Sequence, residues 1–310
     1  IYSPSDVNLI DMKKYALMEN RFFSTGRLGS WMMKNSTSVQ INIDLVNKND
    51  GEEMAYVADC IQPIFSLLFA HSPFVSGLPV NNNYRLKVWN NTDKQRCGHL
   101  IEHGINKKDG LLSQYIDYVF DVPSIFIETK ESTIVNYKGT LGRWLLEKHL
   151  SKELLNKNVL SALHQIFTHV RFKNVIEIRG GDRPPFGYEL APVAFWCGLL
   201  TAEKTRKHIL DLVLEWTQEE RVALNLSAES LDLTQIGPQG KTLDRWLKII
   251  SDVALEGLEE RMVFFKIKSE KKYLEPYLEM ALEKLWTVRA QDSFKKSGLN
   301  INTYLKEVYS

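Results

Sequence analysis

The chain of 310 residues carries 39 lysine and arginine residues against 38 aspartate and glutamate residues, and 44% of its residues are hydrophobic. These values are near the average for a globular protein with a large buried core, and they exclude a disordered chain, collagen and a coiled coil. The net charge of +1 gives no overall electrostatic reason to expect nucleic acid or an acidic membrane surface as a partner, so basic residues that bind a ligand must act locally.

The first predicted strand runs over Val39–Leu45, where apolar and polar residues alternate. Its apolar side chains are expected to pack on a core, while its polar side chains face elsewhere. These polar residues are Gln40, Asn42 and Asp44. Because asparagine and aspartate are depleted in strands, two interpretations stay open: a solvent-facing surface and a set of site residues.

A helix and a second strand are predicted next. After the turn signal at residues 49–51, apolar residues recur at helical spacing over residues 54–68 and predict an amphipathic helix against the sheet. The following stretch, Tyr84–Trp89, is interpreted as a strand with one polar side. That side carries Arg85, Lys87 and Trp89.

A further strand is predicted over Val170–Arg179. Its polar face carries Arg171, Lys173, Glu177 and Arg179. Glu177 and Arg179 project side by side about 7 Å apart along a strand, and such a pair can hold a metal ion together with the phosphate oxygens that the ion neutralises. The alternative is a solvated face with a weak ion pair. The turn signal at residues 180–182 favours a site, because it would end the strand beside the third polar group, Asp182.

Beyond residue 200 nearly every segment has helical periodicity. A capping box over Thr217–Glu220 predicts one helix start, and Thr242 precedes another long amphipathic helix. The sequence therefore predicts an α+β protein, with a sheet-containing core over residues 1–200 and a helical region over residues 201–310 packed on it.

The sequence lacks the motifs of several common kinds of site and a segment that could cross a membrane. The three cysteines, Cys60, Cys97 and Cys197, are far apart without CxxC spacing, which indicates reduced thiols. No apolar stretch has the roughly 20 residues that a membrane span requires. No P-loop, dinucleotide-binding, serine-hydrolase or HExxH motif is present. We expect a cytoplasmic protein without a membrane or nucleic-acid partner.

Six segments occur in one order and with one spacing that is typical of a known family. They are Lys14–Leu45, Gln62–Pro79, Tyr84–Gly98, Tyr115–Phe126, His169–Asp182 and Ala191–Leu200. Together, and above all through YRLKVWNNTDKQRCG and HVRFKNVIEIRGGD, they resemble the glutamate-cysteine ligase family in its plant and bacterial branch. The resemblance spans nearly the whole chain.

The resemblance implies a fold and a reaction. Family members are similar to glutamine synthetase in their catalytic core, an antiparallel sheet that holds ATP and magnesium ions with helices packed behind it. ATP would phosphorylate the γ-carboxylate of glutamate, and the amine of cysteine would then displace phosphate, in the first step of glutathione biosynthesis. Metal ions and arginines stabilise the charge on the transferring phosphoryl group in such reactions. The implied partners are small molecules: glutamate, cysteine and ATP.

Residue by residue, the resemblance assigns the nucleotide and metal region first. Glu177 is similar to the magnesium-binding glutamate of the family, and Arg179 to the catalytic arginine that contacts the ATP phosphates. Gln40 and Asn42 would face the nucleotide and the metal, with Gln40 as a second metal contact.

The substrate region is assigned in the same way. Arg85 resembles the catalytic arginine that holds the carboxylate of glutamate, and Trp89 belongs to the same motif. Lys14 stands where the family has a substrate-binding arginine, and it keeps the charge but loses the bidentate fork. Ile125 replaces a pocket tyrosine of the family. These two departures leave open a related ligase that joins a different carboxylate and amine.

A segment with metal-binding glutamates of the ExE type, which begins the family's chains, has no counterpart here. The start at Ile1 favours the C-terminal part of a longer ligase. A non-catalytic relative that acts as a binding or regulatory protein is the alternative.

Overall fold

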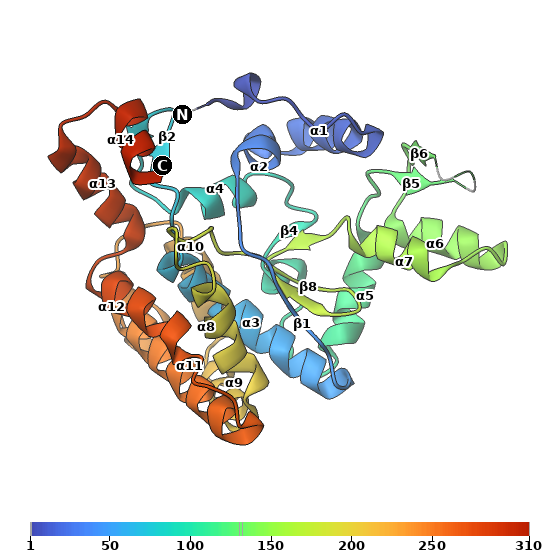
Figure 1. Ribbon diagram of the computed structural model, residues 1–310. Helices are drawn as coiled ribbons and strands as arrows, with labels where there is room; N and C mark the ends of the chain where they lie inside the picture. Colours follow the sequence, from blue (N-terminus) through green and yellow to red (C-terminus); the bar gives the residue numbers. More distant parts are fainter. Residues whose placement is uncertain (1, 130, 132, 310) are drawn as a thin grey trace.

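The computed structural model describes residues 2–129, 131 and 133–309 (Figure 1). The first third of the chain forms η1 (Pro4–Asp6), α1 (Lys13–Thr25), α2 (Gly29–Asn35), β1 (Ile41–Ile43), α3 (Lys48–Leu68), β2 (Phe74–Val75), β3 (Leu78–Pro79), α4 (Tyr84–Asn90), β4 (Cys97–Gly98) and η2 (Leu100–His103). The middle forms α5 (Leu111–Asp121), β5 (Ile127–Glu128), β6 (Ile134–Val135), α6 (Leu141–Leu150), α7 (Asn156–Leu163), β7 (Phe167–Thr168), β8 (Val170–Phe172), β9 (Ile176–Ile178) and α8 (Ala191–Thr201). The remainder forms α9 (Glu203–Leu214), α10 (Gln218–Ser227), η3 (Pro238–Gly240), α11 (Leu243–Phe265), η4 (Lys271–Tyr273), α12 (Glu275–Glu283), α13 (Trp286–Ser297) and α14 (Ile301–Tyr309).

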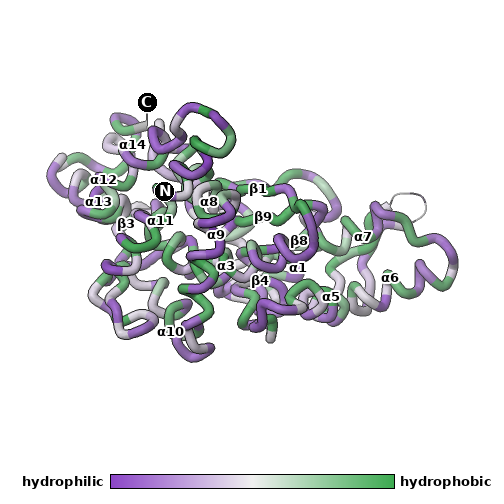
Figure 2. The backbone as a smooth tube through the Cα atoms, turned by 90° about the horizontal axis from the view of Figure 1, so that it is seen from below, coloured by the Kyte–Doolittle hydropathy of each residue, from purple (hydrophilic) through white to green (hydrophobic). Residues whose placement is uncertain are grey.

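A small antiparallel sheet with strand order β1-β9-β8 lies at the centre of the molecule. Figure 2 shows these strands side by side, with α8, α9 and α11 on one side and α5, α6 and α7 on the other. The buried helix α3 packs against β8 and β9 and covers the apolar face of the sheet. Ile41 and Ile43 are buried there, while Asn42 between them is exposed, so the predicted alternation is confirmed over these three residues. The chain is an α+β protein in which helices predominate.

The segment Val170–Arg179 is a hairpin and not the single strand that the alternation predicted. The backbone N–H of Lys173 donates to the carbonyl of Val175, and the chain reverses between β8 and β9. Asn174, which interrupts the apolar alternation, lies in this turn. The hairpin brings Arg171 opposite Glu177, a pairing that a single strand could not make.

The prediction of a strand over Tyr84–Trp89 is wrong, because this segment forms α4. Asn83 caps the helix: its side-chain oxygen accepts a hydrogen bond from the N–H of Leu86, and its amide group donates to the carbonyl of Ser66. Six residues are too few to separate a period of 2 from a period of 3.6, and the cap decides between them. The turn predicted at residues 49–51 likewise lies inside the first turn of α3, which Asn47 caps.

The C-terminal helices start where the capping signals predicted. Thr217 and Glu220 form the capping box of α10, and the Thr242 side chain caps α11. α11 crosses α8 at two glycines: a Cβ on Gly198 would lie 2.2 Å from the carbonyl oxygen of Ala254, and a Cβ on Gly257 would lie 2.0 Å from that of Gly198. The two helix backbones are therefore in direct contact. The domain boundary at residue 200 stays a prediction.

Two further expectations concern the whole chain. The three cysteines are free thiols, and Cys60 and Cys97 are buried. Within residues 2–129, 131 and 133–309, none of the helices combines the length and apolar character that a membrane crossing requires.

Candidate active site

The face of the sheet opposite α3 carries a row of aligned polar residues. Asn42 pairs with Glu177 across β1 and β9, and Glu177 pairs with Arg171 across β9 and β8. Residues paired across a sheet project to the same face, so these three side chains form one line. Gln40 and Asn42 are exposed at the β1 end of this face.

Glu177 is 1% exposed and is held by cations of its own hairpin. The Nε and Nη2 atoms of Arg171 each donate to one oxygen of the Glu177 carboxylate at 3.0 Å, which is a bidentate pair. The ammonium of Lys173 contacts the Oε2 oxygen as well. Burial alone would raise the pKa of Glu177, but the hydrogen bonds and charges of Arg171 and Lys173 outweigh it and lower the pKa to about 2.

The low pKa of Glu177 predicts an acid-sensitive contribution to stability. This contribution is complete above the ordinary glutamate pKa of 4.5 and is lost as the pH falls toward the folded-state pKa of about 2. As the pH decreases over this range, the free energy of unfolding of Glu177→Gln should fall less steeply than that of the wild type. The two slopes should differ by up to about 1.4 kcal/mol per pH unit. Urea unfolding of both proteins between these pH values measures the slopes. Parallel slopes would contradict the assignment.

Arg179 follows β9 and is buried with an incomplete set of hydrogen bonds. Its guanidinium lies over the rings of Trp89 and Phe167, with centroid distances of 5.0 and 5.4 Å. Its Nη1 atom is buried and has no hydrogen-bond partner among the described residues. Burial, with the neighbouring charge of Arg171, lowers the pKa of Arg179 to about 9.

Arg85 reaches the same place from α4. It donates from Nε to the carbonyl of Thr37 and from Nη2 to the carbonyl of Arg179, both at 3.0 Å, and its guanidinium lies 5.4 Å from the centroid of Trp89. Its Nη1 atom is also buried, and no described residue accepts a hydrogen bond from it. Burial lowers the pKa of Arg85 to about 10, although the carboxylate of Asp182 opposes this shift.

Asp182 fixes the chain directly after Arg179. Its carboxylate accepts hydrogen bonds from the backbone N–H of His71 at 2.9 Å and from the Ser72 hydroxyl at 2.7 Å, and it lies 3.8 Å from Arg85. These contacts hold the loop after α3 against the turn that follows β9.

Two buried guanidinium groups therefore meet on Trp89, and each has an N–H group that donates to no described residue. A buried N–H group without an acceptor is unfavourable, and an anion that accepts these hydrogen bonds would remove the penalty. Planar guanidinium groups suit phosphate and carboxylate oxygens in particular. The arrangement has the chemistry of an oxyanion receptor.

Comparison of the sequence with family models shows which known proteins the chain resembles. The model described as glutamate-cysteine ligase family 2 matches residues 2–275. The chain belongs to the glutamate-cysteine ligase family. It is 33% identical to the chloroplastic glutamate-cysteine ligase of Arabidopsis thaliana over 262 residues. This aligned region covers 83% of this chain and 49% of the relative. It is 32% identical to the chloroplastic enzymes of Nicotiana tabacum and Medicago truncatula, again over 83% of this chain.

This member of the ligase family spans about half the length of the curated relatives it matches. The names of those relatives place them in the chloroplast, whereas the sequence analysis predicted a cytoplasmic protein. For this family member the location stays a prediction.

In the ligase-family chain, some of the predicted site residues lie together and others do not. Arg85, Trp89 and Arg179 are in contact, and Glu177 lies beside them on β9. Lys14 on α1 lies over the ring of Tyr15, with its nitrogen 4.8 Å from the ring centroid.

Two contributors were missed by the sequence analysis of this ligase-family protein. Arg171 was placed on the polar face but given no role, because its pairing with Glu177 depends on the hairpin turn. Phe167 on β7 was not considered, although its ring supports both Arg171 and Arg179. The sequence signal for the turn was Asn174, a polar residue at an apolar position of the alternating run Val170–Arg179.

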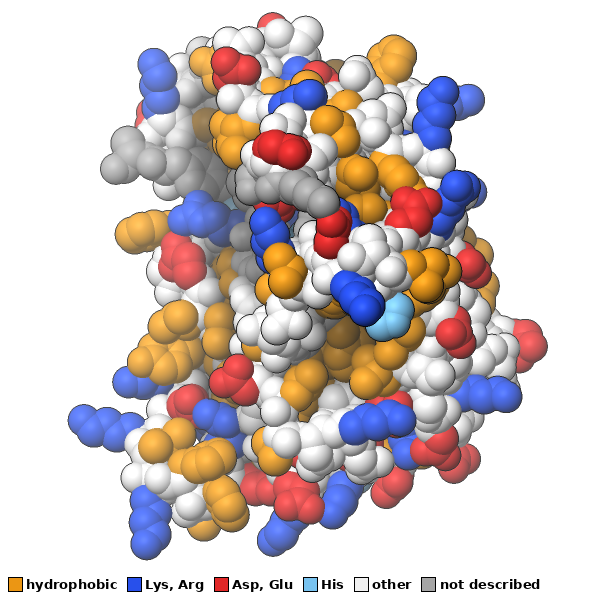
Figure 3. All heavy atoms as spheres, turned by 90° about the vertical axis from the view of Figure 1, so that its right-hand side faces the viewer, with side chains coloured by type: hydrophobic (Ala, Val, Ile, Leu, Met, Phe, Trp, Pro, Cys, Tyr) orange, Lys and Arg blue, Asp and Glu red, His pale blue; other side chains and the backbone are white. Residues whose placement is uncertain are grey.

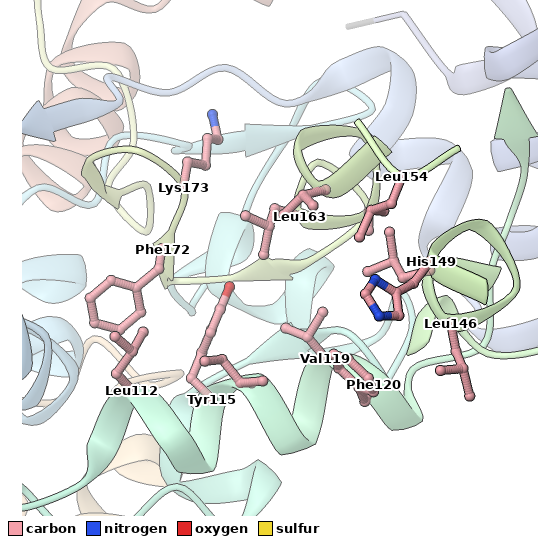
Figure 4. A pocket seen from close by; sticks show the side chains of 14 residues that line it. Leu112, Tyr115, Val119, Phe120, Leu146, His149, Leu154, Leu163, Phe172 and Lys173 are labelled. Carbon is pink, nitrogen blue, oxygen red and sulfur yellow. The ribbon is translucent and has the colours of Figure 1, made fainter. Parts of the chain in front are cut away.

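The ligase-family chain has one cavity beside Trp89 and another beside the hairpin. One of about 440 Å³ lies beside Trp89 and is lined in part by Lys94, Glu102 and Glu229. The other, of about 500 Å³, is apolar and lies between α5, α6, α7 and β8, where Figure 4 shows Leu163 and Val119 facing one another across it. Figure 3 shows hydrophobic side chains gathered in a hollow on that side of the molecule. Only the first cavity adjoins the ring that the arginines cover.

The residues present do not make a magnesium centre on their own. Among the described residues, no three or more histidine, cysteine, aspartate or glutamate side chains are grouped so that they could hold a metal ion. Glu177, the predicted metal ligand, already has both oxygens in ion pairs. The assignment of Glu177 and Gln40 to magnesium stays a prediction.

Proposed function

We propose that this chain supplies the phosphate and carboxylate contacts of an ATP-dependent ligase that joins the γ-carboxylate of glutamate to the amine of cysteine. The observation that carries the proposal is the pair of buried guanidinium groups on Trp89, each with an N–H group that donates to no described residue, in the two motifs that define the family resemblance. In this proposal the central sheet is one wall of a core similar to that of glutamine synthetase.

The reaction needs two anions to meet. The γ-phosphoryl group passes from ATP to a carboxylate oxygen of glutamate, with ADP as the leaving group. The amine then attacks the acyl carbon, phosphate leaves with its electron pair, and the nitrogen loses a proton. Arg179 would donate to the phosphate oxygens and Arg85 to the glutamate carboxylate, so that each charge is neutralised in a site with little water.

The cavity beside Trp89 is proposed as the binding site of the amine substrate. The carboxylates of Glu102 and Glu229 line it, and they would attract an ammonium group. It adjoins Trp89, whose ring both arginines cover, and the arginines themselves do not line it.

Magnesium is the family's implied cofactor, and when bound it would neutralise phosphate charge. Because Glu177 is engaged by Arg171 and Lys173, no step of this proposal is assigned to the ion. Glu177 is instead proposed here to keep Arg171 and Lys173 in place beside Arg179.

The test is phosphate release by the native protein with ATP, magnesium and a panel of amino acids, with mass spectrometry of the product. Release that needs both glutamate and cysteine, and a product of the mass of γ-glutamylcysteine, is the expected result. Release with a different pair of substrates would overturn the substrate assignment in favour of a related ligase. Tight ATP binding without release for any pair would overturn the enzyme assignment in favour of a binding relative.

A different substrate pair is the second candidate, and one observation favours it. The ammonium of Lys14 lies over the ring of Tyr15, and Ile125 is buried where the family resemblance has a tyrosine. Restoring the family residues in Lys14→Arg and Ile125→Tyr would lower the KM for glutamate or cysteine if these substrates are correct. A higher KM for both would favour the second candidate.

A further inference from the structure

The apolar cavity between α5, α6, α7 and β8 combines a buried floor with an exposed rim. The floor residues are Tyr115, Val119, Leu145, Ala162 and Phe172. The rim residues, each between 37% and 52% exposed, are Ile116, Phe120, Leu146, Leu154 and Val159. Large apolar side chains that are exposed together mark a surface that binds something, because water alone covers them at a cost.

The size of the cavity favours a small molecule. Its volume of about 500 Å³ lies within the range of small-molecule sites in proteins. One turn of an α-helix, about 10 Å across and 5.4 Å long, would already take up most of this volume. The cavity therefore suits a single acyl chain or ring system better than a helix of a partner protein.

The charge of the lining indicates what the polar end of such a molecule must be. All lining residues except His149 and Lys173 are hydrophobic, and none of the lining residues that the structure describes is acidic. Figure 4 shows the imidazole ring of His149 directed from α6 toward the space between Leu163 and Val119. An imidazole offers an N–H donor in its neutral form and two in its charged form. The lining thus complements an apolar body with one anionic end.

Lys173 contributes its stem to this lining and not its charge. Figure 4 shows the Lys173 nitrogen directed away from the cavity, and the ammonium pairs with Glu177. His149 is therefore the side chain that would meet the anionic end.

The cavity is separate from the arginine pair. Phe172, which lines it, is the neighbour of Arg171 on β8, and neighbouring residues of a strand project to opposite faces of the sheet. Phe172 belongs to the buried core, whereas Arg171 pairs with Glu177 on the polar face. A ligand in this cavity would lie on the other side of β8 from the candidate active site.

We propose that the cavity binds one molecule of a small amphipathic acid of the fatty-acid type, with its apolar body between α5 and α7 and its carboxylate at His149. This binding goes beyond the proposed ligase and does not depend on it. The bound acid covers the apolar rim, and His149 donates a hydrogen bond to the carboxylate.

The experiment measures the binding of free dodecanoate to the native protein by titration calorimetry, below the concentration at which the acid forms micelles. One molecule should bind per chain. Decanoate and octanoate should each bind roughly tenfold more weakly than the acid that is two methylene groups longer, because the apolar body is buried.

Val159→Glu tests the location. It places a carboxylate at the rim, beside the apolar body and the anionic end of the ligand, and should weaken dodecanoate binding at least about tenfold. Val263→Glu is the matched control, because Val263 is an exposed valine of α11 that lies outside the lining, and its affinity should equal that of the wild type.

His149→Leu tests the anionic end. The wild type should bind dodecanoate roughly tenfold more tightly than dodecanol, which is the size of a hydrogen bond to a charged group. His149→Leu should bind the two equally.

Three results would overturn the proposal: no binding of dodecanoate, undiminished binding by Val159→Glu, or equal binding of dodecanol and dodecanoate by the wild type. A wild type that is dimeric where Val159→Glu is monomeric would overturn it in favour of a second copy of the chain. Sedimentation of the wild type, but not of Val159→Glu, with phosphatidylglycerol vesicles would overturn it in favour of a membrane surface.

Discussion

Arg179→Met is expected to weaken ATP binding by about 100-fold or more, because it removes two charge-assisted hydrogen bonds to phosphate, each of which contributes about 1.5 kcal/mol. Titration calorimetry with ATP and magnesium measures the affinity. Arg183→Met is the matched control: Arg183 is an arginine four residues further on whose side chain pairs with Glu189 at the surface. Its ATP affinity should match that of the wild type.

The same variant has a second expected result, which separates a ligand-binding arginine from a structural one. Burial lowers the pKa of Arg179 from 12.5 to about 9, so the folded state disfavours its charged form. Replacing this buried charge by an apolar side chain should therefore remove an unfavourable contribution to folding. Near neutral pH the variant should unfold at or above the wild-type temperature. A lower unfolding temperature together with unchanged ATP affinity would show that Arg179 serves the fold alone.

Gly257→Ala is expected to destabilise the protein by about 3 kcal/mol, at the upper end of the cost of overpacking a core. The added methyl group would lie 2.0 Å from the carbonyl oxygen of Gly198, and neither helix backbone can move without separating α8 from α11. Urea unfolding measures the loss.

Gly51→Ala is the matched control for this prediction. Gly51 also lies inside a helix, but its Cβ would make ordinary van der Waals contacts, with the Leu45 side chain at 3.4 Å and the Phe172 ring at 3.6 Å. Because alanine has a higher helix propensity, this variant should be as stable as the wild type or more stable, by up to about 1 kcal/mol. Equal losses in the two variants would contradict the close crossing of α8 and α11.

Arg85 and Trp89 show why part of the site was predictable from sequence although the local structure was not. Residues four apart share one side of a strand and also one side of a helix. The predicted placement of Arg85 and Trp89 on one side therefore holds in α4 as well, and their joint role in the site stays a prediction. Lys87, two residues from each, shares their side only in a strand, and α4 directs it elsewhere.

Glu177 shows what the sequence could not provide. Its partner Arg171 is six residues away, and their contact depends on a turn at Asn174 that has none of the usual Asn-Gly or Asp-Gly signals. Arg179 and Trp89 are 90 residues apart, and only tertiary packing brings them together. The caps at Thr217 and Thr242 are local signals, and these were predicted correctly.

The most direct test of the central claim is a crystal structure of the protein with a non-hydrolysable ATP analogue and glutamate. We expect a phosphate oxygen within hydrogen-bond distance of Nη1 of Arg179, and a glutamate carboxylate oxygen at the same distance from Nη1 of Arg85. Phosphates bound away from Trp89, with both Nη1 atoms still without acceptors, would contradict it.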